Sequence, residues 1–577
     1  MKTITAADYF VEFLIANGVT DVFGYQGGMI AYIFDSLGKY RNEISYHSCG
    51  NEQGAALAAC AYAQASGKLG VAITTSGPGF TNLVSGIANA WFDSIPVLFL
   101  SGQVNTKDKK RDRPFRQLGF QEIQATKIAE TITKKVYDVD MDTDIPQCLN
   151  DAYLTAMSER KGPVYLDFPI NICREVLTVD DVTPVSLTKT PPIKADAILT
   201  DLKKAQRPAI IAGAGILQAG LRDDFRQMVE FLGLPVVHTM PASAVLPGDS
   251  PYRMGYIGGT ARREAGLILE HADYVLTLGT RLCSKQIGHN LSLFAPKAKK
   301  IVRVDLDTTE FERKVKDDEV QIAADLRAVI PGLLFALQDT HYTPCHQVWL
   351  DTCARVKALL NCCDITQGNE IFERISKELP EDANLVMDVG KNLIYGTQSA
   401  VIKKQTRFFL SAGLGTMGYS IPASIGAYYG NGCPTFSFNG DGGAQMNIQE
   451  LNTIAKNKLP IKIFVLNNNA LGNIVMFQKQ YLGNRIVATS EAEGDYFSCN
   501  FQRIAEAYGI RSYRISADEI TEYREQLLDD QPTLFELIYE DCECLPSIVA
   551  GGDFIGGGPK LPDCVINELN TLLMGCE

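Results

Sequence analysis

The chain has 577 residues and a formal net charge of −13, from 67 acidic and 54 basic side chains. Hydrophobic residues make up 46% and charged residues 21%, as in globular proteins, which excludes disorder or a fibrous repeat over most of the length. The length allows about three or four domains, and the acidic balance argues against a general binder of nucleic acid or anionic membranes, because such a surface needs basic excess.

The first third of the chain alternates short apolar runs with longer helical stretches. The runs at 71–75 and 164–168 predict strands, and the stretches at 52–65 and 81–91 predict helices. Repeated strand–helix units favour a parallel sheet with helices on both faces. We therefore predict a first domain over residues 1–180, followed by a linker rich in Thr and Pro.

Two further α/β units follow in the chain. The second, predicted over 190–340, begins with a strand at 209–212. The third, predicted over 365–545, contains strands at 435–438 and 461–466. The predicted fold class is α/β, with three doubly wound parallel-sheet domains.

The glycine-rich tail, residues 546–577, is unsuited to a core strand. A lid, an arm that reaches another subunit and plain surface packing remain open for it. Asp8 and Glu12 stand where a signal peptide would be apolar. The 15 cysteines are scattered without zinc-site spacing, so we expect reduced thiols and a cytoplasmic protein.

Polar residues follow two neighbouring strands of the third unit. Gly440-Asp441-Gly442-Gly443 comes after the strand at 435–438, and Asn467-Asn468-Asn469 after the strand at 461–466. The carboxyl ends of parallel strands are where open α/β sheets bind ligands, and Mg²⁺ prefers oxygen ligands completed by substrate phosphates. The helix that starts near Gly443 would offer N–H groups to a diphosphate. A lone Gly-Asp-Gly can equally be an ordinary turn.

The spacing of these two motifs carries a resemblance. The 24 residues from Gly443 to Leu466 separate them, and the chain resembles the thiamine-diphosphate (ThDP) enzymes, in which GDG is followed by NN about 25 residues later. The resemblance implies that Asp441, Asn468 and the carbonyl of Ala470 hold Mg²⁺. It further implies cofactor contacts from Gly442, Gly443, Leu471 and Gly472.

A glutamate in the first domain fits the activation step of this family. Glu52 stands after a predicted strand, where an acid could merely stabilise a helix dipole. The residues Gly54-Ala55-Ala56 and the segment 75–82 nevertheless resemble the pyrimidine-binding domain of acetolactate-synthase-like enzymes. The resemblance implies that Glu52, which we expect to be buried, hydrogen-bonds N1′ of the aminopyrimidine. Cofactor contacts are also implied for Gly28, Pro78 and Asn82.

Other segments of the third unit complete the implied cofactor site. In 413–419, which resembles the family's wedge segment, Met417 would support the bent cofactor and Gly415 would contribute backbone to the pyrimidine. Ordinary core filling is the alternative for Met417. Diphosphate contacts are implied for Gly390, Lys391 and Asn392. Relatives often carry Gln-His at the last two positions, so the chemistry of this contact has changed.

The substrate residues rest on weaker matches. Phe120 and Gln121 lie in a segment that resembles the family's AFQE motif, whose Phe and Gln approach the keto acid, and we assign Gln121 a catalytic role with Glu52 and Met417. Gln26 replaces Pro in a YPGG-like loop. Phe477 stands where biosynthetic acetolactate synthases usually carry Trp, which leaves the acceptor open. Asn51 replaces the family's His, and no His-His pair is present, which disfavours simple protonation as in pyruvate decarboxylase.

The middle unit resembles the FAD-binding domain of acetolactate synthase. The similarity lies in Gly213-Ala214-Gly215, Gly279-Thr280-Arg281 and Asp305-Leu306-Asp307. The family's RFDDR run is replaced by residues 281–285, Arg-Leu-Cys-Ser-Lys. FAD binding and an empty or ADP-type site therefore both remain open.

Together these observations predict a ThDP- and Mg²⁺-dependent enzyme that decarboxylates a 2-keto acid such as pyruvate and transfers the acyl unit to a carbonyl acceptor. The resemblance implies a homodimer or homotetramer with active sites between chains, and no nucleic-acid or membrane partner. A non-ligating decarboxylase or oxidase on the same scaffold is the first alternative. A degenerate nucleotide-binding regulatory protein is the second, and a nicotinamide dehydrogenase is disfavoured because no full GxGxxG is present.

Overall fold

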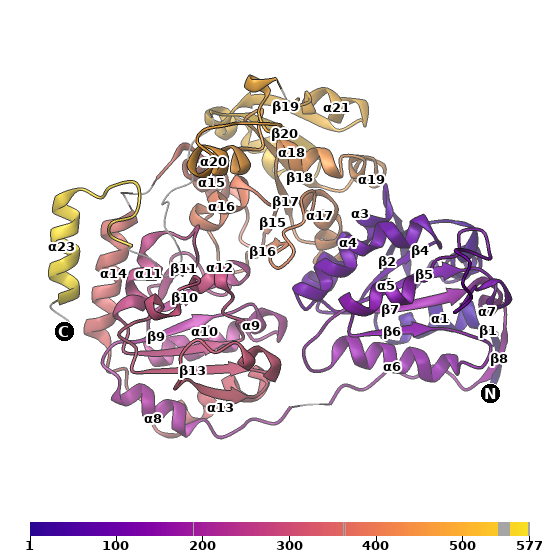
Figure 1. Cartoon of the computed structure of the whole chain (residues 1–577), viewed down its shortest axis with the longest axis horizontal. Coiled ribbons are helices and arrows are strands. Elements are labelled where there is room, and N and C mark those ends of the chain that lie inside the picture. The colour runs from indigo at the N-terminus through magenta and orange to yellow at the C-terminus, as the bar shows by residue number, and fades with distance from the viewer. Residues whose placement is uncertain (189, 362, 364, 495, 541–553, 575–577) are drawn as a thin grey trace.

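Three six-stranded sheets organise the chain in the computed structural model, which describes residues 1–188, 190–361, 363, 365–494, 496–540 and 554–574 (Figure 1). Every strand pair within these sheets is parallel. The predicted α/β class with three parallel-sheet domains is therefore confirmed.

The first domain has the strand order β3-β2-β4-β5-β7-β6. Its strands are β2 (Asp21–Tyr25), β3 (Ser45–Ser48), β4 (Gly70–Thr74), β5 (Val97–Gln103), β6 (Lys135–Asp138) and β7 (Val164–Pro169). Its helices are α1 (Ala6–Ala16), α2 (Ala31–Lys39), α3 (Glu52–Ser66), α4 (Pro78–Phe92), α5 (Ala125–Ala129), α6 (Ile145–Met157) and α7 (Ile170–Cys173). A separate antiparallel pair, β1 (Lys2–Thr5) with β8 (Val176–Val179), closes the domain.

The middle domain has the strand order β11-β10-β9-β12-β13-β14. Its strands are β9 (Pro208–Ala212), β10 (Val236–His238), β11 (Arg253–Tyr256), β12 (Tyr274–Leu278), β13 (Lys300–Asp305) and β14 (Val320–Ala323). Its helices are α8 (Asp196–Lys204), α9 (Gly215–Gln218), α10 (Arg222–Leu232), α11 (Arg263–His271), α12 (Ser284–Ile287), α13 (Leu326–Asp339) and α14 (Gln347–Asn361).

The third domain has the strand order β16-β15-β17-β18-β20-β19. Its strands are β15 (Asn384–Met387), β16 (Arg407–Leu410), β17 (Thr435–Gly440), β18 (Ile461–Asn467), β19 (Arg511–Ser516) and β20 (Thr533–Ile538). Its helices are α15 (Gln367–Glu378), α16 (Lys391–Ser399), α17 (Ser420–Asn431), α18 (Asp441–Met446), α19 (Glu450–Asn457), α20 (Gly472–Tyr481), α21 (Phe501–Ala507) and α22 (Arg524–Leu528).

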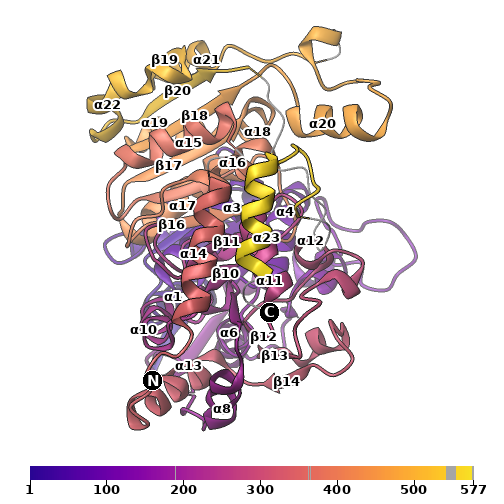
Figure 2. The same ribbon diagram turned by 90° about the vertical axis from the view of Figure 1, so that its left-hand side faces the viewer.

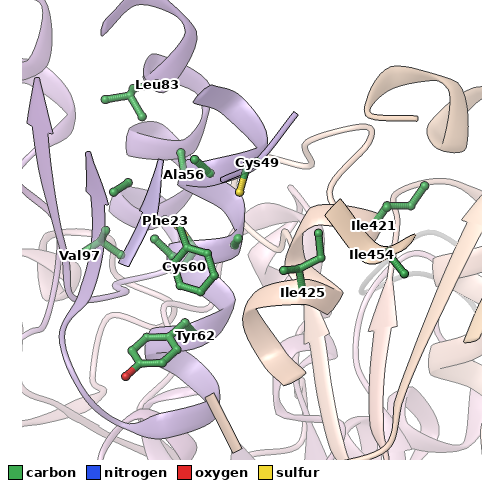
Figure 3. Close-up of a cluster of buried hydrophobic side chains, with 14 of the residues drawn as sticks. Phe23, Cys49, Ala56, Cys60, Tyr62, Leu83, Val97, Ile421, Ile425 and Ile454 are labelled. Carbon is green, nitrogen blue, oxygen red and sulfur yellow. The ribbon is translucent and has the colours of Figure 1, made fainter. Parts of the chain in front are cut away.

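Helix α3 joins the first and third domains. Its residues from Gly54 to Ala63 are all buried, and the many alanines let neighbouring backbones come close. A Cβ atom on Gly426 of α17 would lie only 1.8 Å from the carbonyl oxygen of Ala58. Figure 3 shows Ala56 and Cys60 of α3 in one hydrophobic cluster with Ile421 and Ile425 of α17. The two domains therefore share a core.

The described part of the tail packs against the middle domain. Helix α23 (Asp563–Met574) lies beside α14 in both views (Figures 1 and 2). Leu569 and Leu573 pack against Leu267, Val356 and Leu360. The described residues of the tail thus pack on the middle domain, while residues 546–553 and 575–577 lie outside the described residues.

Two smaller observations concern the described residues. The buried Cys49 and Cys60 are free thiols. No helix in the described part of the chain combines the length and the apolar character that a membrane crossing requires.

Candidate active site

The carboxyl edge of the third sheet collects most of the predicted cofactor residues. Strands β16, β15, β17 and β18 are consecutive neighbours, and Gly440 at the end of β17 pairs with Leu466 of β18. The residues that follow these strand ends therefore converge. The predicted adjacency of the two motif-bearing strands is confirmed.

Asp441 is a buried carboxylate at this edge, with 2% of its surface exposed. Its oxygens accept hydrogen bonds from the N–H groups of Gly442, at 2.9 Å, and Ala470, at 3.1 Å. Burial raises its pKa to about 6, although these N–H groups and the side chains of Ser498 and Tyr496 favour the charged form. A carboxylate surrounded by neutral donors at a strand end suits a cation, which would compensate the buried charge.

The turn that carries Asn468 is shaped by Asn467. The side-chain oxygen of Asn467 accepts from the N–H of Asn469 and from the hydroxyl of Ser498, both at 3.0 Å. Its amide group donates to Glu536 at 2.8 Å. Asn469 adopts a left-handed conformation, with φ of 55°, which Asn tolerates well. Asn467 and Glu536 thus position Asn468, which is half-buried, and Ala470, which is buried. Sequence reasoning missed this role, although Asn467 belongs to the motif.

Two glycines bring the wedge segment and the metal motif together. A Cβ atom on Gly442 would lie 2.4 Å from Leu471 and 2.8 Å from the terminal methyl of Met417. A Cβ atom on Gly443 would lie 2.9 Å from the carboxyl of Asp388. A larger residue at either position would have to displace these side chains. Met417 is itself only half-buried, so core filling does not account for it.

Asp388 ties the end of β15 to the segment that contains Gly415 and Met417. The carboxyl accepts from the N–H groups of Gly418 and Ser420, both at 3.0 Å. Complete burial raises its pKa to about 6. This contact, which the sequence did not reveal, sets the position of the wedge relative to Gly443.

The three predicted diphosphate residues begin α16. Gly390 has φ of 113°, which demands glycine. The amide of Asn392 donates to the carbonyl oxygens of Asp388, at 2.8 Å, and Phe438, at 3.1 Å. Asn392 therefore holds the ends of β15 and β17 together. Lys391, with 6% exposure, supplies the positive charge of this corner.

A second group of predicted residues lies at the carboxyl edge of the first sheet. Glu52 begins α3, whose N-terminus is capped by Asn51 through a 2.7 Å hydrogen bond from the N–H of Gly54. The carboxyl of Glu52 accepts from the amide of the exposed Asn82 at 2.9 Å. Glu52 was expected to be buried, and this was wrong for the single chain, because its side chain is only half-buried beside the exposed Asn82.

The remaining first-domain residues surround the end of β4. Gln121 has φ of 66°, and a Cβ atom on Gly77 would lie 3.1 Å from it. A Cβ atom on Gly27 would lie 2.5 Å from Thr75, which brings the loop of Gln26 and Gly28 to the same edge. Pro78, at the start of α4, is exposed there.

Two predicted substrate residues are largely uncovered. Phe120 is 81% exposed, and Phe477 on α20 is 50% exposed. The ring of Phe477 lies against Tyr481, with the ring centres 4.9 Å apart. The structure thus gathers one set of residues around Asp441 and a second around Glu52, each at the carboxyl edge of its own sheet.

The basic loop before Gln121 is anchored in the core. Lys109 is only 8% exposed, and its ammonium group pairs with Asp138 and, at 3.2 Å, with the buried Asp167 of β7. Without Lys109, Asp167 would be a buried charge without this cationic partner.

A cavity of about 450 Å³ lies where all three domains meet. Gly215 and Gly279, which follow the neighbouring strands β9 and β12, line it together with Asp305, the last residue of β13. Five arginines also contribute to its wall: Arg160, Arg222, Arg281, Arg327 and Arg407. Five carboxylates also line it, those of Asp93, Glu159, Asp223, Asp305 and Asp325. The cavity lies at strand ends, where α/β sheets bind ligands, and its guanidinium groups are suitable donors to phosphate.

Family models of thiamine pyrophosphate (TPP) enzymes match three parts of the chain. TPP is another name for ThDP. The N-terminal TPP binding domain matches residues 4–128, the central domain 195–333 and the C-terminal TPP binding domain 388–537.

Three curated relatives are similar over nearly the whole length. The probable acetolactate synthase large subunit of Methanocaldococcus jannaschii is 32% identical, over 95% of this chain and 94% of that protein. The acetolactate synthase isozyme 2 large subunit of Escherichia coli is 31% identical, over 95% of this chain and 98% of that protein. The acetolactate synthase large subunit of Lactococcus lactis is 32% identical, over 95% of both chains.

Proposed function

Because the chain belongs to the thiamine pyrophosphate enzyme family and is an acetolactate-synthase-like enzyme that makes a carbon–carbon bond, we propose the following reaction for it. The enzyme decarboxylates a 2-keto acid, pyruvate, and transfers the acyl unit to a carbonyl acceptor, with Mg²⁺ as a second cofactor. When bound, ThDP supplies carbanion stabilisation at the former keto carbon.

The observation that carries the proposal is the arrangement around Asp441. Its buried carboxylate, with the side chain of Asn468 and the carbonyl of Ala470, would hold Mg²⁺ at the adjoining ends of β17 and β18. The backbone at Gly442, Gly443, Leu471 and Gly472 would contact the diphosphate. Lys391 would add charge compensation, while Gly390 and Asn392 shape the corner.

Residues of the first domain would handle the proton and the substrate. Glu52 would hold a proton at N1′ of the pyrimidine, with Asn82 fixing its carboxyl. Gln121 would hydrogen-bond the keto acid, and Phe120 and Phe477 would cover it. Gln26 and Gly28 would line the same space, and Met417 and Gly415 would support the cofactor from the other domain.

The exposed aromatic residues support an assembly. Phe120 and Phe477 remain uncovered in one chain, and Glu52 is half-buried. We propose a cytoplasmic homodimer or homotetramer whose active sites lie between chains, each with the Glu52 edge of one chain and the Asp441 edge of another. Sedimentation of the cofactor-loaded protein tests this, and an active monomer would contradict it.

We propose that the cavity at the junction of the three domains binds FAD, with ADP as the alternative nucleotide. Guanidinium groups of its wall would donate hydrogen bonds to a diphosphate, and Gly215 and Gly279 line the cavity at the ends of β9 and β12. A flavin absorption spectrum in the purified protein, or release of ADP on heating, distinguishes the two. Release of neither nucleotide would contradict the proposal.

Product analysis tests the reaction. We expect the protein with ThDP, Mg²⁺ and pyruvate to form acetolactate, and to accept other keto acids or aldehydes as second substrates. Free aldehyde as the sole product would favour a non-ligating decarboxylase, and peroxide an oxidase. Failure to bind ThDP would favour a nucleotide-binding regulatory protein.

The variant Glu52→Gln tests the catalytic assignment. It keeps the size of the side chain but removes the carboxylate, so we expect turnover of pyruvate to fall at least about 100-fold, the usual range for a lost acid–base group. ThDP affinity should change little. Unchanged turnover in this variant would contradict the role of Glu52.

A further inference from the structure

A buried carboxylate of the third domain contacts the loop that carries Glu52 in the first domain. Glu450, the first residue of α19, is fully buried. Its Oε1 accepts hydrogen bonds from the N–H groups of Gly50, at 2.9 Å, and Asn51, at 3.3 Å. These two residues immediately precede Glu52. The contact therefore spans 400 residues of sequence and reaches the neighbour of the activating acid.

The fit around this contact is tight enough to require glycine on the first-domain side. A Cβ atom on Gly54 would lie 2.1 Å from Oε1 of Glu450, and one on Gly50 would lie 2.5 Å from the side chain of Gln449. The hydroxyl of Thr453, one turn along α19, lies 3.1 Å from Oε2 of Glu450 and 3.2 Å from the carbonyl oxygen of Ser48. Helix α19 thus forms hydrogen bonds to the loop at Ser48, Gly50 and Asn51.

The hydrogen bonds lead directly to Glu52. Asn51, whose N–H is held by Glu450, is also the residue that caps α3. Because Glu52 directly follows Asn51 as the first residue of α3, the position of Asn51 also fixes the backbone from which the Glu52 side chain extends. The loop has few alternatives, since an N–H group buried without an acceptor is unfavourable.

A similar contact runs in the opposite direction across the same pair of domains. Asp93, which follows α4 in the first domain, accepts from the N–H groups of Gly413, at 2.7 Å, and Ala412, at 2.9 Å. These residues lead into the segment that contains Met417. Each domain therefore holds a loop of the other through a carboxylate and two consecutive N–H groups.

We propose that Glu450 is a positioning residue for the reaction: it fixes the backbone at Gly50 and Asn51 and so sets the place of Glu52 at the cofactor pyrimidine. This inference rests on the proposed function of Glu52. The positioning depends on the oxygen of Glu450 that accepts the two hydrogen bonds. An amide of the same shape keeps that oxygen, and its NH₂ group can donate to the hydroxyl of Thr453, so Glu450→Gln should preserve the contact.

Two measurements on Glu450→Ala test the proposal. In the protein without cofactor, amide hydrogen exchange of a peptide covering residues 48–56 should become at least tenfold faster, because two N–H groups lose their acceptor. In the protein with ThDP and Mg²⁺, exchange of the C2 proton of bound ThDP for deuterium should slow at least tenfold, while the Kd for ThDP changes less than threefold. Glu450→Gln should restore both rates to within threefold of the wild type.

Asp273→Ala is the matched control. In the middle domain Asp273 also accepts from two consecutive N–H groups, those of Gln206 at 2.9 Å and Arg207 at 2.8 Å. Its loss should lower the Tm without changing either exchange rate. If Glu450→Ala does not fold, Glu450→Asp, which withdraws the carboxylate by one methylene, should show the same two changes.

Three results would overturn the proposal. They are unchanged amide exchange at 48–56, normal C2-proton exchange despite a loosened loop, and a Glu450→Gln variant as slow as Glu450→Ala. Wild-type protein that fails to exchange the C2 proton would instead contradict the proposed function. The amide exchange without cofactor would still decide whether Glu450 holds the loop.

Discussion

Single carboxylates at strand and helix ends determine where the candidate site residues lie. Asp388, Asp441 and Glu450 are all buried, and the backbone N–H groups around them are their main partners. A buried carboxylate destabilises the folded state unless its charge is compensated, as it is when the group binds a cation or accepts hydrogen bonds from a loop.

Asp441→Ala should separate cofactor binding from folding. ThDP with Mg²⁺ should raise the Tm of the wild type, because a ligand that binds only the folded state stabilises it. The variant should lose this rise, and its Kd for ThDP should increase at least about tenfold, since the proposed metal site would lack its anionic ligand.

The unliganded Asp441→Ala protein should have a Tm equal to or above the wild-type value, because a buried charge has been removed. Asp529→Ala is a suitable control, since Asp529 pairs with Lys462 at 2.7 Å on another part of the sheet. That variant should be less stable but keep the full response to ThDP and Mg²⁺. A normal response in Asp441→Ala would contradict the metal assignment.

Glu450 should also leave a signature in the pH dependence of stability. Burial raises its pKa to about 7 from 4.5, so the folded state holds this proton more tightly than the unfolded state. The stability is therefore greatest below about pH 4.5 and falls as the pH rises to about 7. The buried thiol of Cys49 interacts with Glu450, and burial and the Glu450 charge raise the pKa of this thiol well above its usual value.

Glu450→Gln removes this titration. Relative to the wild type, the variant should gain stability on the order of 3 kcal/mol between pH 4.5 and pH 8, as measured by denaturant unfolding at several pH values. Parallel curves for the two proteins would show that Glu450 does not titrate in this range.

At the scale of elements, the contact between α3 and α17 is the seam of the two cofactor domains. Gly426→Ala should force these helices apart, because the new methyl would meet the carbonyl of Ala58. We expect the free energy of unfolding, measured in urea, to fall by about 1–3 kcal/mol, the usual effect of overpacking.

Gly38→Ala is the control for this change. Gly38 lies in α2, is exposed, and has no atom within 4 Å of its added Cβ. Alanine there should stabilise the protein by up to about 1 kcal/mol, because glycine is a poor helix former. Equal effects of the two substitutions would contradict the tight contact.

Sequence patterns predicted the elements that are long and regular and the motifs that follow them. The strands at 435–440 and 461–467 and their loops were placed correctly relative to each other. The patterns could not reveal short strands such as β10 and β14, because three or four residues carry little periodicity. Nor could they pair Glu450 with Gly50, since nothing local in either segment indicates a partner 400 residues away.

At the scale of the whole molecule, one buried arginine fastens the tail. The guanidinium of Arg263 on α11 donates to the carbonyl oxygens of Phe554 at 3.0 Å, Ile555 at 3.2 Å and Pro559 at 2.5 Å. Arg263→Ala should therefore lower the free energy of unfolding by about 1–3 kcal/mol, because buried carbonyl groups lose their donor. Limited proteolysis should then cut near residue 554 faster.

An exposed arginine offers the comparison. Arg355 on α14 pairs with Glu568 of the tail at 3.8 Å, with 64% of its side chain exposed. Arg355→Ala should change stability by less than about 1 kcal/mol and leave the cleavage rate unchanged. A tail released equally by both substitutions would contradict the special role of Arg263.

The cavity between the three domains also has a consequence for how the molecule unfolds. Its wall takes residues from every domain, among them Asp93, Arg327 and Phe409, so no domain can open without dismantling it. A nucleotide present at 100 times its Kd would add about 2.7 kcal/mol to the folded state, and that energy would be lost whichever domain melted first. Filling the cavity should thus merge separate melting steps into one cooperative calorimetric transition.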